Sequence, residues 1–174
     1  MFSKLSYREQ NASRKGAFKR ARNRFRMLND DEISELQLAV EQRDLARTES
    51  LLQEENGDDL TGLQIFADHT LLMYACERGT PEIVKHLLDK GAQVSELEWS
   101  TNNELKSALR NSHQSQEILK LILAAVPADI RADMIETDWD PDGMDEGEAK
   151  SPLDMARDMG KQDCLDLLRA GLSD

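Results

Sequence analysis

The stretch Thr70–Ala92, TLLMYACERGTPEIVKHLLDKGA, sets the pattern for most of the chain. Its apolar residues keep fixed distances from Ala75, and they are Leu72, Ile83, Leu87 and Leu88. This spacing places apolar side chains on one stripe of each of two short helices. Gly79 can supply the turn between the helices, and Gly91 can take the left-handed conformation after the second. The stretch therefore predicts a helix–turn–helix unit.

The same frame recurs along the chain. Its anchor alanines are Ala39, Ala75, Ala108 and Ala156, which are 36, 33 and 48 residues apart. The third copy fits only with two extra residues in its turn, and an insertion precedes the fourth. A helix pair of this length cannot bury its apolar stripe alone, so a period of about 33 residues indicates a stack of such pairs. A generic helical bundle would also show apolar stripes, but not this fixed frame of glycine and alanine.

Three segments resemble parts of the ankyrin repeat. Thr70–Ala75 (TLLMYA) and Ser151–Ala156 (SPLDMA) are similar to its opening Thr-Pro-Leu-His-x-Ala, and Pro81–Ala92 (PEIVKHLLDKGA) is similar to its second helix. Two positions depart from the motif: Leu71 stands in place of the proline in the second copy, and Arg43 in place of the glycine in the first. The resemblance implies an all-α ankyrin-repeat solenoid of stacked helix pairs with short hairpin-like loops.

The resemblance also divides the chain into two parts, a basic N-terminal extension at residues 1–31 and a repeat domain at residues 32–174. We expect the extension to be helical. The expected repeats are 32–57, 69–94, 102–126 and 150–172, with an acidic insertion at 127–149. In the first repeat, Arg47 and Thr48 replace the apolar pair of the second repeat, which is typical of an end repeat with one polar face.

Composition and charge place limits on the class of protein. The net charge is −12, but residues 1–28 hold nine Lys/Arg and one acid, so the rest carries −20. Such an acidic body attracts basic partners and repels nucleic acid. No apolar run approaches a membrane span, and no signal peptide stands at the N-terminus. We therefore expect a cytoplasmic protein in which Cys76 and Cys164 are reduced and buried in the core.

The family resemblance implies that a partner protein binds the concave face and the loop tips. The residues expected to contact it are Met73, Tyr74, Glu77, Arg78, Glu98, Trp99, Lys106, Arg110, Trp139, Asp140, Met155 and Arg157. Both tryptophans fall in segments between repeats, where each can be either a lid on the stack or an exposed anchor. Tryptophan is enriched among the residues that dominate interface energies.

The insertion before the last repeat is acidic and contains half of a calcium-binding pattern. Asp138, Asp140 and Asp142 alternate and are followed by Gly143, as in the first half of an EF-hand loop. The twelfth position, which needs a bidentate glutamate, is Ala149. We therefore expect a long acidic loop that contacts a basic patch on a partner. Calcium binding by the three aspartates is the weaker alternative.

The basic arm, residues 13–28 (SRKGAFKRARNRFRML), carries Phe18, Phe25 and Leu28 at helical spacing among its Lys and Arg residues. Four interpretations remain open. The arm can dock on the acidic body as a tail, cap the first repeat as a helix, bind nucleic acid or an anionic membrane, or act as a targeting segment. A docking or capping role is favoured.

Nothing in the sequence supports catalysis or a cofactor. The histidines, at 69, 86 and 113, have no Cys or acid at metal-ligand spacing, and no phosphate-binding or nucleophile motif occurs. We therefore expect a non-catalytic adaptor or regulator that binds a protein and no small-molecule substrate. Two alternatives remain: an inhibitor or immunity-type protein that blocks a basic active site of a toxin or nucleic-acid enzyme, and a secreted or translocated effector localised by the basic arm.

Overall fold

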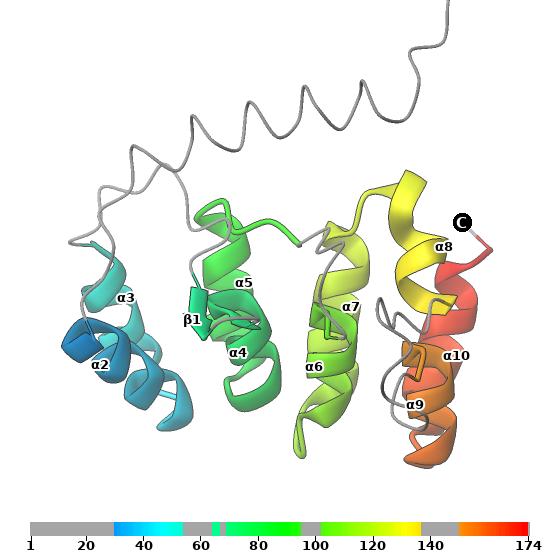
Figure 1. Cartoon of the computed structure of the whole chain (residues 1–174), viewed down its shortest axis with the longest axis horizontal. Coiled ribbons are helices and arrows are strands. Elements are labelled where there is room, and N and C mark those ends of the chain that lie inside the picture. Colours follow the sequence, from blue (N-terminus) through cyan, green and yellow to red (C-terminus); the bar gives the residue numbers. More distant parts are fainter. Residues whose placement is uncertain (1–29, 54–63, 67–68, 95–101, 137–149, 174) are drawn as a thin grey trace, which may run out of the picture.

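Four helix pairs stand side by side in the computed structural model (Figure 1). The structure describes residues 30–53, 64–66, 69–94, 102–136 and 150–173. The pairs are α2 (Asp30–Glu41) with α3 (Leu45–Gln53), α4 (Leu71–Arg78) with α5 (Pro81–Asp89), α6 (Glu104–Arg110) with α7 (Ser115–Ala125), and α9 (Pro152–Asp158) with α10 (Gln162–Gly171). The expected all-α solenoid of stacked pairs is confirmed.

A short antiparallel hairpin lies between the first and second pairs. Strand β1 (Gln64–Phe66) pairs with β2 (His69–Thr70), and α4 begins at the residue after β2. No helix within the described ranges is long and apolar enough to cross a membrane.

Side chains cap the first residues of several helices. The hydroxyls of Thr70 and Thr80 accept the backbone N–H groups of Met73 and Ile83, at 3.1 and 3.4 Å. Asn103 caps α6 and Ser151 caps α9 in the same way. Each cap satisfies a donor that the helix leaves unpaired. These caps explain where α4, α5, α6 and α9 begin.

The core runs along the whole stack. The four anchor alanines are fully buried, and so are the apolar residues that face them from the second helices, among them Ile83, Leu87, Ile118, Leu119, Ile122 and Leu168. Cys76 and Cys164 are buried and unpaired, as expected. Gly79 allows a close approach at the first joint, because a Cβ there would lie 3.3 Å from Cγ1 of Val40 and 2.7 Å from the carbonyl oxygen of Ala75.

One asparagine joins the second and third pairs. The side-chain amide of Asn111 donates to the carbonyl oxygens of Cys76 and Gly79, both at 3.1 Å. Its Oδ1 accepts the N–H groups of His113 and Gln114, both at 3.0 Å. The carbonyls at the end of α4 have no partner within their own helix, so Asn111 satisfies groups on both sides of the joint.

A lysine makes the next joint. Nζ of Lys161 donates to the carbonyl oxygens of Leu109 and Asn111, at 2.6 and 2.8 Å, and to the hydroxyl of Ser115 at 2.8 Å. A side chain of the fourth pair thereby satisfies carbonyl groups at the C-terminal end of α6. All three ammonium protons are used within the protein.

The acidic insertion begins with a helix, which the expectation of a long loop did not include. Helix α8 (Ala128–Glu136) packs against α9 and α10, and its Ile135 is fully buried. A Cβ on Gly171 would lie 3.3 Å from Cδ1 of Ile135, so the glycine lets α8 approach α10. Apolar residues at one helical stripe therefore turn this part of the insertion into a cover for the last pair. Residues 137–149, including the candidate calcium ligands, lie outside the described residues.

We predict that Asn111→Ala lowers the free energy of unfolding by about 2–3 kcal/mol, because it leaves two carbonyls and two amides at a buried joint without partners. Urea denaturation followed by circular dichroism measures the loss. The matched control is Ser112→Ala, whose exposed side chain makes no hydrogen bond to another described residue and whose loss should change stability by less than about 0.5 kcal/mol. Equal losses in the two variants would show that the joint does not depend on the asparagine.

Candidate functional site

The first helices of the four pairs share one exposed face. We call it the first-helix face and define it by the positions one residue before and two and three residues after each anchor alanine. Its partly or fully exposed members are Leu38, Glu41, Gln42, Tyr74, Glu77, Arg78, Arg110, Met155, Asp158 and Met159. In α6 the corresponding Ser107 and Asn111 are buried, so only Arg110 of that helix reaches the surface fully. The face therefore has two well-exposed ends and a narrow middle.

Two of the expected contact residues are buried. Met73 is fully buried and Lys106 is 3% exposed. Each lies two residues before its anchor alanine, on helices that have a packed neighbour on both sides: α2 and α6 flank α4, and α4 and α9 flank α6. Neither side chain offers a surface to a partner in this structure.

The remaining expected residues divide into two groups. Tyr74, Glu77, Arg78, Arg110, Met155 and Arg157 are partly or fully exposed on the first helices. The group outside the described residues comprises Glu98, Trp99, Trp139 and Asp140. Arg157 stands where α4 has the buried Cys76, and its side chain is 54% exposed beside Asp154. A polar residue at this inward position marks α9 as the first helix of an end repeat.

A polar network crosses the middle of the face and orients Arg110. Nε2 of His69 lies 2.8 Å from the side-chain nitrogen of Asn102 and 4.0 Å from a carboxylate oxygen of Glu77. Oδ1 of Asn102 in turn accepts from the Arg110 guanidinium at 2.6 Å. Asn102 also donates to the hydroxyl of Ser107 at 3.2 Å. The network joins the second and third repeats and fixes the direction of the exposed guanidinium.

Tyr74 connects the first two repeats on the same face. Its hydroxyl donates to a carboxylate oxygen of Glu41 at 2.6 Å. Burial, reinforced by the hydrogen bond and the negative charge of Glu41, raises the pKa of Tyr74 to about 12. The phenol is therefore held as a donor at neutral pH, and one edge of its ring remains available on the surface.

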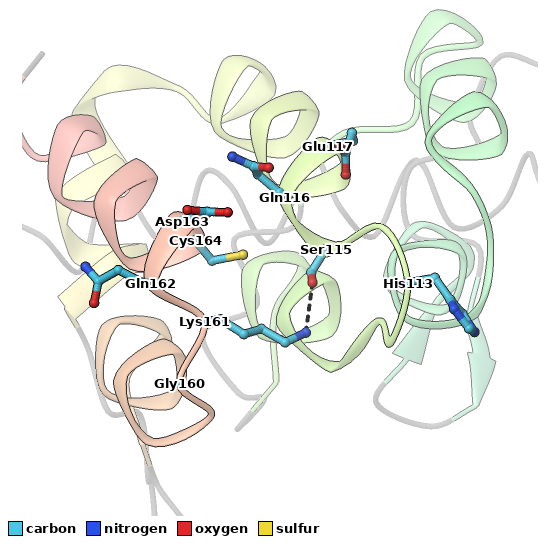
Figure 2. Close-up of a pocket in the computed structure, with 9 residues that line it drawn as sticks. All are labelled: His113, Ser115, Gln116, Glu117, Gly160, Lys161, Gln162, Asp163 and Cys164. Atoms are coloured by element: carbon cyan, nitrogen blue, oxygen red, sulfur yellow. Dashed lines mark hydrogen bonds between the residues drawn. The ribbon is translucent and has the colours of Figure 1, made fainter.

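An open groove lies between the third and fourth pairs, at the N-terminal ends of α7 and α10 (Figure 2). Its volume is about 420 Å³, and its lining includes Ser115, Lys161 and Cys164. Figure 2 shows the Lys161 side chain reaching the Ser115 hydroxyl, and burial lowers the pKa of this lysine. Burial also raises the pKa of the Cys164 thiol. A protonated thiol is a poor nucleophile, so the groove is best explained as the surface of a structural joint.

Within the described ranges, no group of three or more His, Cys, Asp or Glu residues is placed to hold a metal ion. The aspartates considered for calcium fall outside these ranges, so that alternative stays a prediction.

The stacked pairs agree with a comparison of the chain with protein-family models. The model for ankyrin repeats in three copies matches residues 36–138. The chain belongs to the ankyrin-repeat family. A comparison with curated proteins gives no match. The matched span includes the first three repeats and α8, and the fourth repeat, α9 with α10, stacks beyond it in the same arrangement. Ankyrin repeats generally act as protein–protein interaction modules, and the family is typically non-catalytic.

The sequence interpretation missed two residues of the ankyrin first-helix face. Leu38 is 43% exposed and Met159 is 46% exposed, which makes them the most exposed large apolar side chains in the described ranges. The signal for Leu38 was present, because it occupies the same frame position as Tyr74 and Met155. Met159 lies three residues after its anchor alanine, as Arg78 does, so its frame position carried the same signal.

We predict that Glu41→Ala lowers the pKa of Tyr74 from about 12 toward the ordinary value of about 10, because it removes the acceptor and the nearby charge. Absorbance at 295 nm measures the titration, with Tyr7→Phe as the background that leaves Tyr74 as the remaining tyrosine. The neutral phenol stabilises the fold fully below the unfolded pKa, and this contribution is lost as the pH rises through about 12. An unchanged midpoint in Glu41→Ala would contradict the contact.

Proposed function

We propose that this ankyrin-repeat protein is a non-catalytic adaptor or regulator that binds a partner protein through the first-helix face and the adjoining linking segments. One observation carries the proposal. Apolar or aromatic side chains reach the surface at the same frame position on three first helices: Leu38 is exposed, and Tyr74 and Met155 are partly exposed. Tyr74 and Met155 also pack against the core, but the part of each side chain that remains in solvent, together with Leu38, forms a row that is typical of an interaction surface.

The charge of the linking segments supports a partner with a basic surface. The segments that join one repeat to the next and fall outside the described residues are 54–63, 67–68, 95–101 and 137–149. Together they hold thirteen Asp/Glu and no Lys or Arg. The arginines of the first helices have neighbours within the protein: Arg78 lies 3.1 Å from Glu77, and Arg110 bonds to Asn102. The linking segments are therefore acidic, and their charge would steer a basic partner toward the protein.

Tryptophan anchors are part of the proposal. Trp99 and Trp139 belong to two of these acidic segments, next to Glu98 and Asp140. Aromatic anchors surrounded by acidic residues would suit a basic protein surface, since tryptophan contributes contact area and cation–π attraction to Lys and Arg.

The same acidic excess favours a second candidate, an inhibitor that covers the basic active site of an enzyme. A nucleic-acid enzyme has such a site because it binds phosphates with Lys and Arg. The two functions are distinguished by the partner. An enzyme that loses activity in the complex is inhibited, whereas an unaffected partner is recruited.

Photo-crosslinking tests the surface before the partner is known. A p-benzoylphenylalanine residue would replace Tyr74 on the first-helix face, and in a matched protein it would replace Lys120 on α7, an exposed residue of a second helix. Both proteins would be irradiated in lysate of the native host. We expect one host protein to crosslink through position 74, with a yield that increases with irradiation, and not to crosslink through position 120. Crosslinking of the same protein through both positions would argue against the face.

We predict that Tyr74→Ala and Arg78→Ala each weaken binding to that partner by about tenfold or more, the effect of losing a central interface residue. Titration calorimetry with the purified partner measures the dissociation constants. Lys85→Ala and Lys120→Ala, which remove exposed side chains from second helices, should leave the constant within about twofold. Similar losses in all four variants would contradict the proposed surface.

A further inference from the structure

Helix α2 carries an exposed acidic side that none of the described helices covers. Asp31, Glu35 and Leu38 recur at helical spacing, and all three are exposed. The helix contains five acids and no Lys or Arg. The described elements that pack closely on α2 are α3 and α4. We call this surface the α2 side. One ion pair weakens its charge, since Arg47 lies 4.0 Å from Glu35.

The last pair of the stack, α9 with α10, has a further helix packed against it. Helix α8 packs on α9 and α10, and buries Ile135 there. An end repeat of a solenoid needs either a polar outer surface or a covering element. The α2 side has an exposed leucine between acids, which is neither a fully polar surface nor a covered one.

The segment that precedes α2 has the complementary chemistry. Residues 1–28 contain nine Lys/Arg and one acid. The basic arm, residues 13–28, places Phe18, Phe25 and Leu28 among these cations, so it offers apolar and positive groups together. It ends two residues before Asp30, which keeps its effective concentration near α2 in the millimolar range typical of short linkers.

The reach of the arm is sufficient. Helix α2 has 12 residues and is therefore about 18 Å long. The arm has 16 residues, and even at the helical rise of 1.5 Å per residue it would extend about 24 Å. After a reversal at Leu28 and Asn29 it can therefore follow α2 along its length.

We propose that the basic arm docks on the α2 side of its own chain, with its Lys and Arg residues near Asp31 and Glu35 and an aromatic residue on Leu38. This inference does not rest on the proposed function. It has a consequence for it, because Leu38 also belongs to the first-helix face. A docked arm covers the N-terminal end of that face, and a partner that uses Leu38 has to displace it.

Limited trypsin digestion of the full chain tests the docking. The arm holds several Lys and Arg sites, and cleavage follows the population of the undocked arm when docking is fast. The test variant combines Asp31→Asn, Glu35→Gln and Leu38→Ser, which adds no new trypsin site. Mass spectrometry would measure the initial rate of cleavage within residues 14–26. We expect the test variant to be cleaved about fivefold faster or more.

The far end of the stack offers a matched control. Asp163→Asn, Asp166→Asn and Met159→Ser remove two acids and one apolar residue from the last repeat. Asp163, like Asp31, lies in the first turn of its helix. Asp166 has a side chain that is 62% exposed and 3.7 Å from Arg169, against 58% and 4.0 Å for Glu35 and Arg47. Met159 is 46% exposed, against 43% for Leu38.

The outcomes separate cleanly, provided that circular dichroism gives the same melting behaviour for both variants. Faster cleavage in the test variant alone supports docking on α2. Equal rates in wild type and both variants overturn it, and so does equal acceleration in both variants, which would indicate diffuse attraction to the acidic body. Protection of the wild-type arm that grows with protein concentration also overturns it, since the arm would then bind a second copy.

Discussion

Two joints in this stack depend on a side chain of one repeat that closes the carbonyl end of the first helix of the repeat before it. A short helix has several carbonyls without partners at its C-terminus, and here these ends are buried between neighbouring pairs. Water cannot satisfy them there, so the next repeat has to do so. Asn111 bonds to the end of α4, and Lys161 bonds to the end of α6. The stacking of apolar surfaces therefore depends on a polar contact at each of these two joints.

This constraint also decides which residues can bind a partner. A first helix with a neighbour on each side and a second helix behind it exposes little beyond three of its positions. In α4 these positions are Tyr74, Glu77 and Arg78. In α6 the polar residues Ser107 and Asn111 turn inward to serve the network and the joint, and Arg110 alone reaches the surface fully. The surface available to a partner therefore consists of the positions that stacking does not bury, and fewest of these lie on α6.

The sequence alone was sufficient for the fold because the frame is set by local rules. Helix packing within one repeat requires an alanine at the anchor and paired leucines on the second helix. The turn requires glycine or another residue that can adopt the turn conformation. Even Arg43, which departs from the motif's glycine, adopts the left-handed φ of 58° that Gly160 shows at the same position, with φ of 65°. The backbone therefore follows the frame where the residue type does not.

The site was harder to predict because it depends on contacts between repeats. Met73 and Lys106 occupy positions that one helix alone would leave exposed, and only the neighbouring helices bury them. The weak third copy was a related case. Its turn, residues 111–114, is two residues longer than residues 79–80, and it begins with the asparagine that makes the joint. The third repeat, whose local pattern fits the frame least well, is thus the one that supplies the asparagine of this joint.

The two ends of the stack follow from the same logic. Each repeat that is followed by another buries an apolar residue directly after its anchor alanine, as Val40, Cys76 and Leu109 do, because the next repeat packs there. Arg157 at this position needs water, and α8 covers the apolar surface that remains nearby. At the first repeat, another segment of the chain has to cover Leu38, or this leucine stays exposed to water. The acidic helix α2 and the basic, aromatic arm that precedes it have complementary chemistry, so the arm can serve as this cover. Because Leu38 belongs both to the α2 side and to the first-helix face, docking of the arm and access of a partner are coupled at this residue.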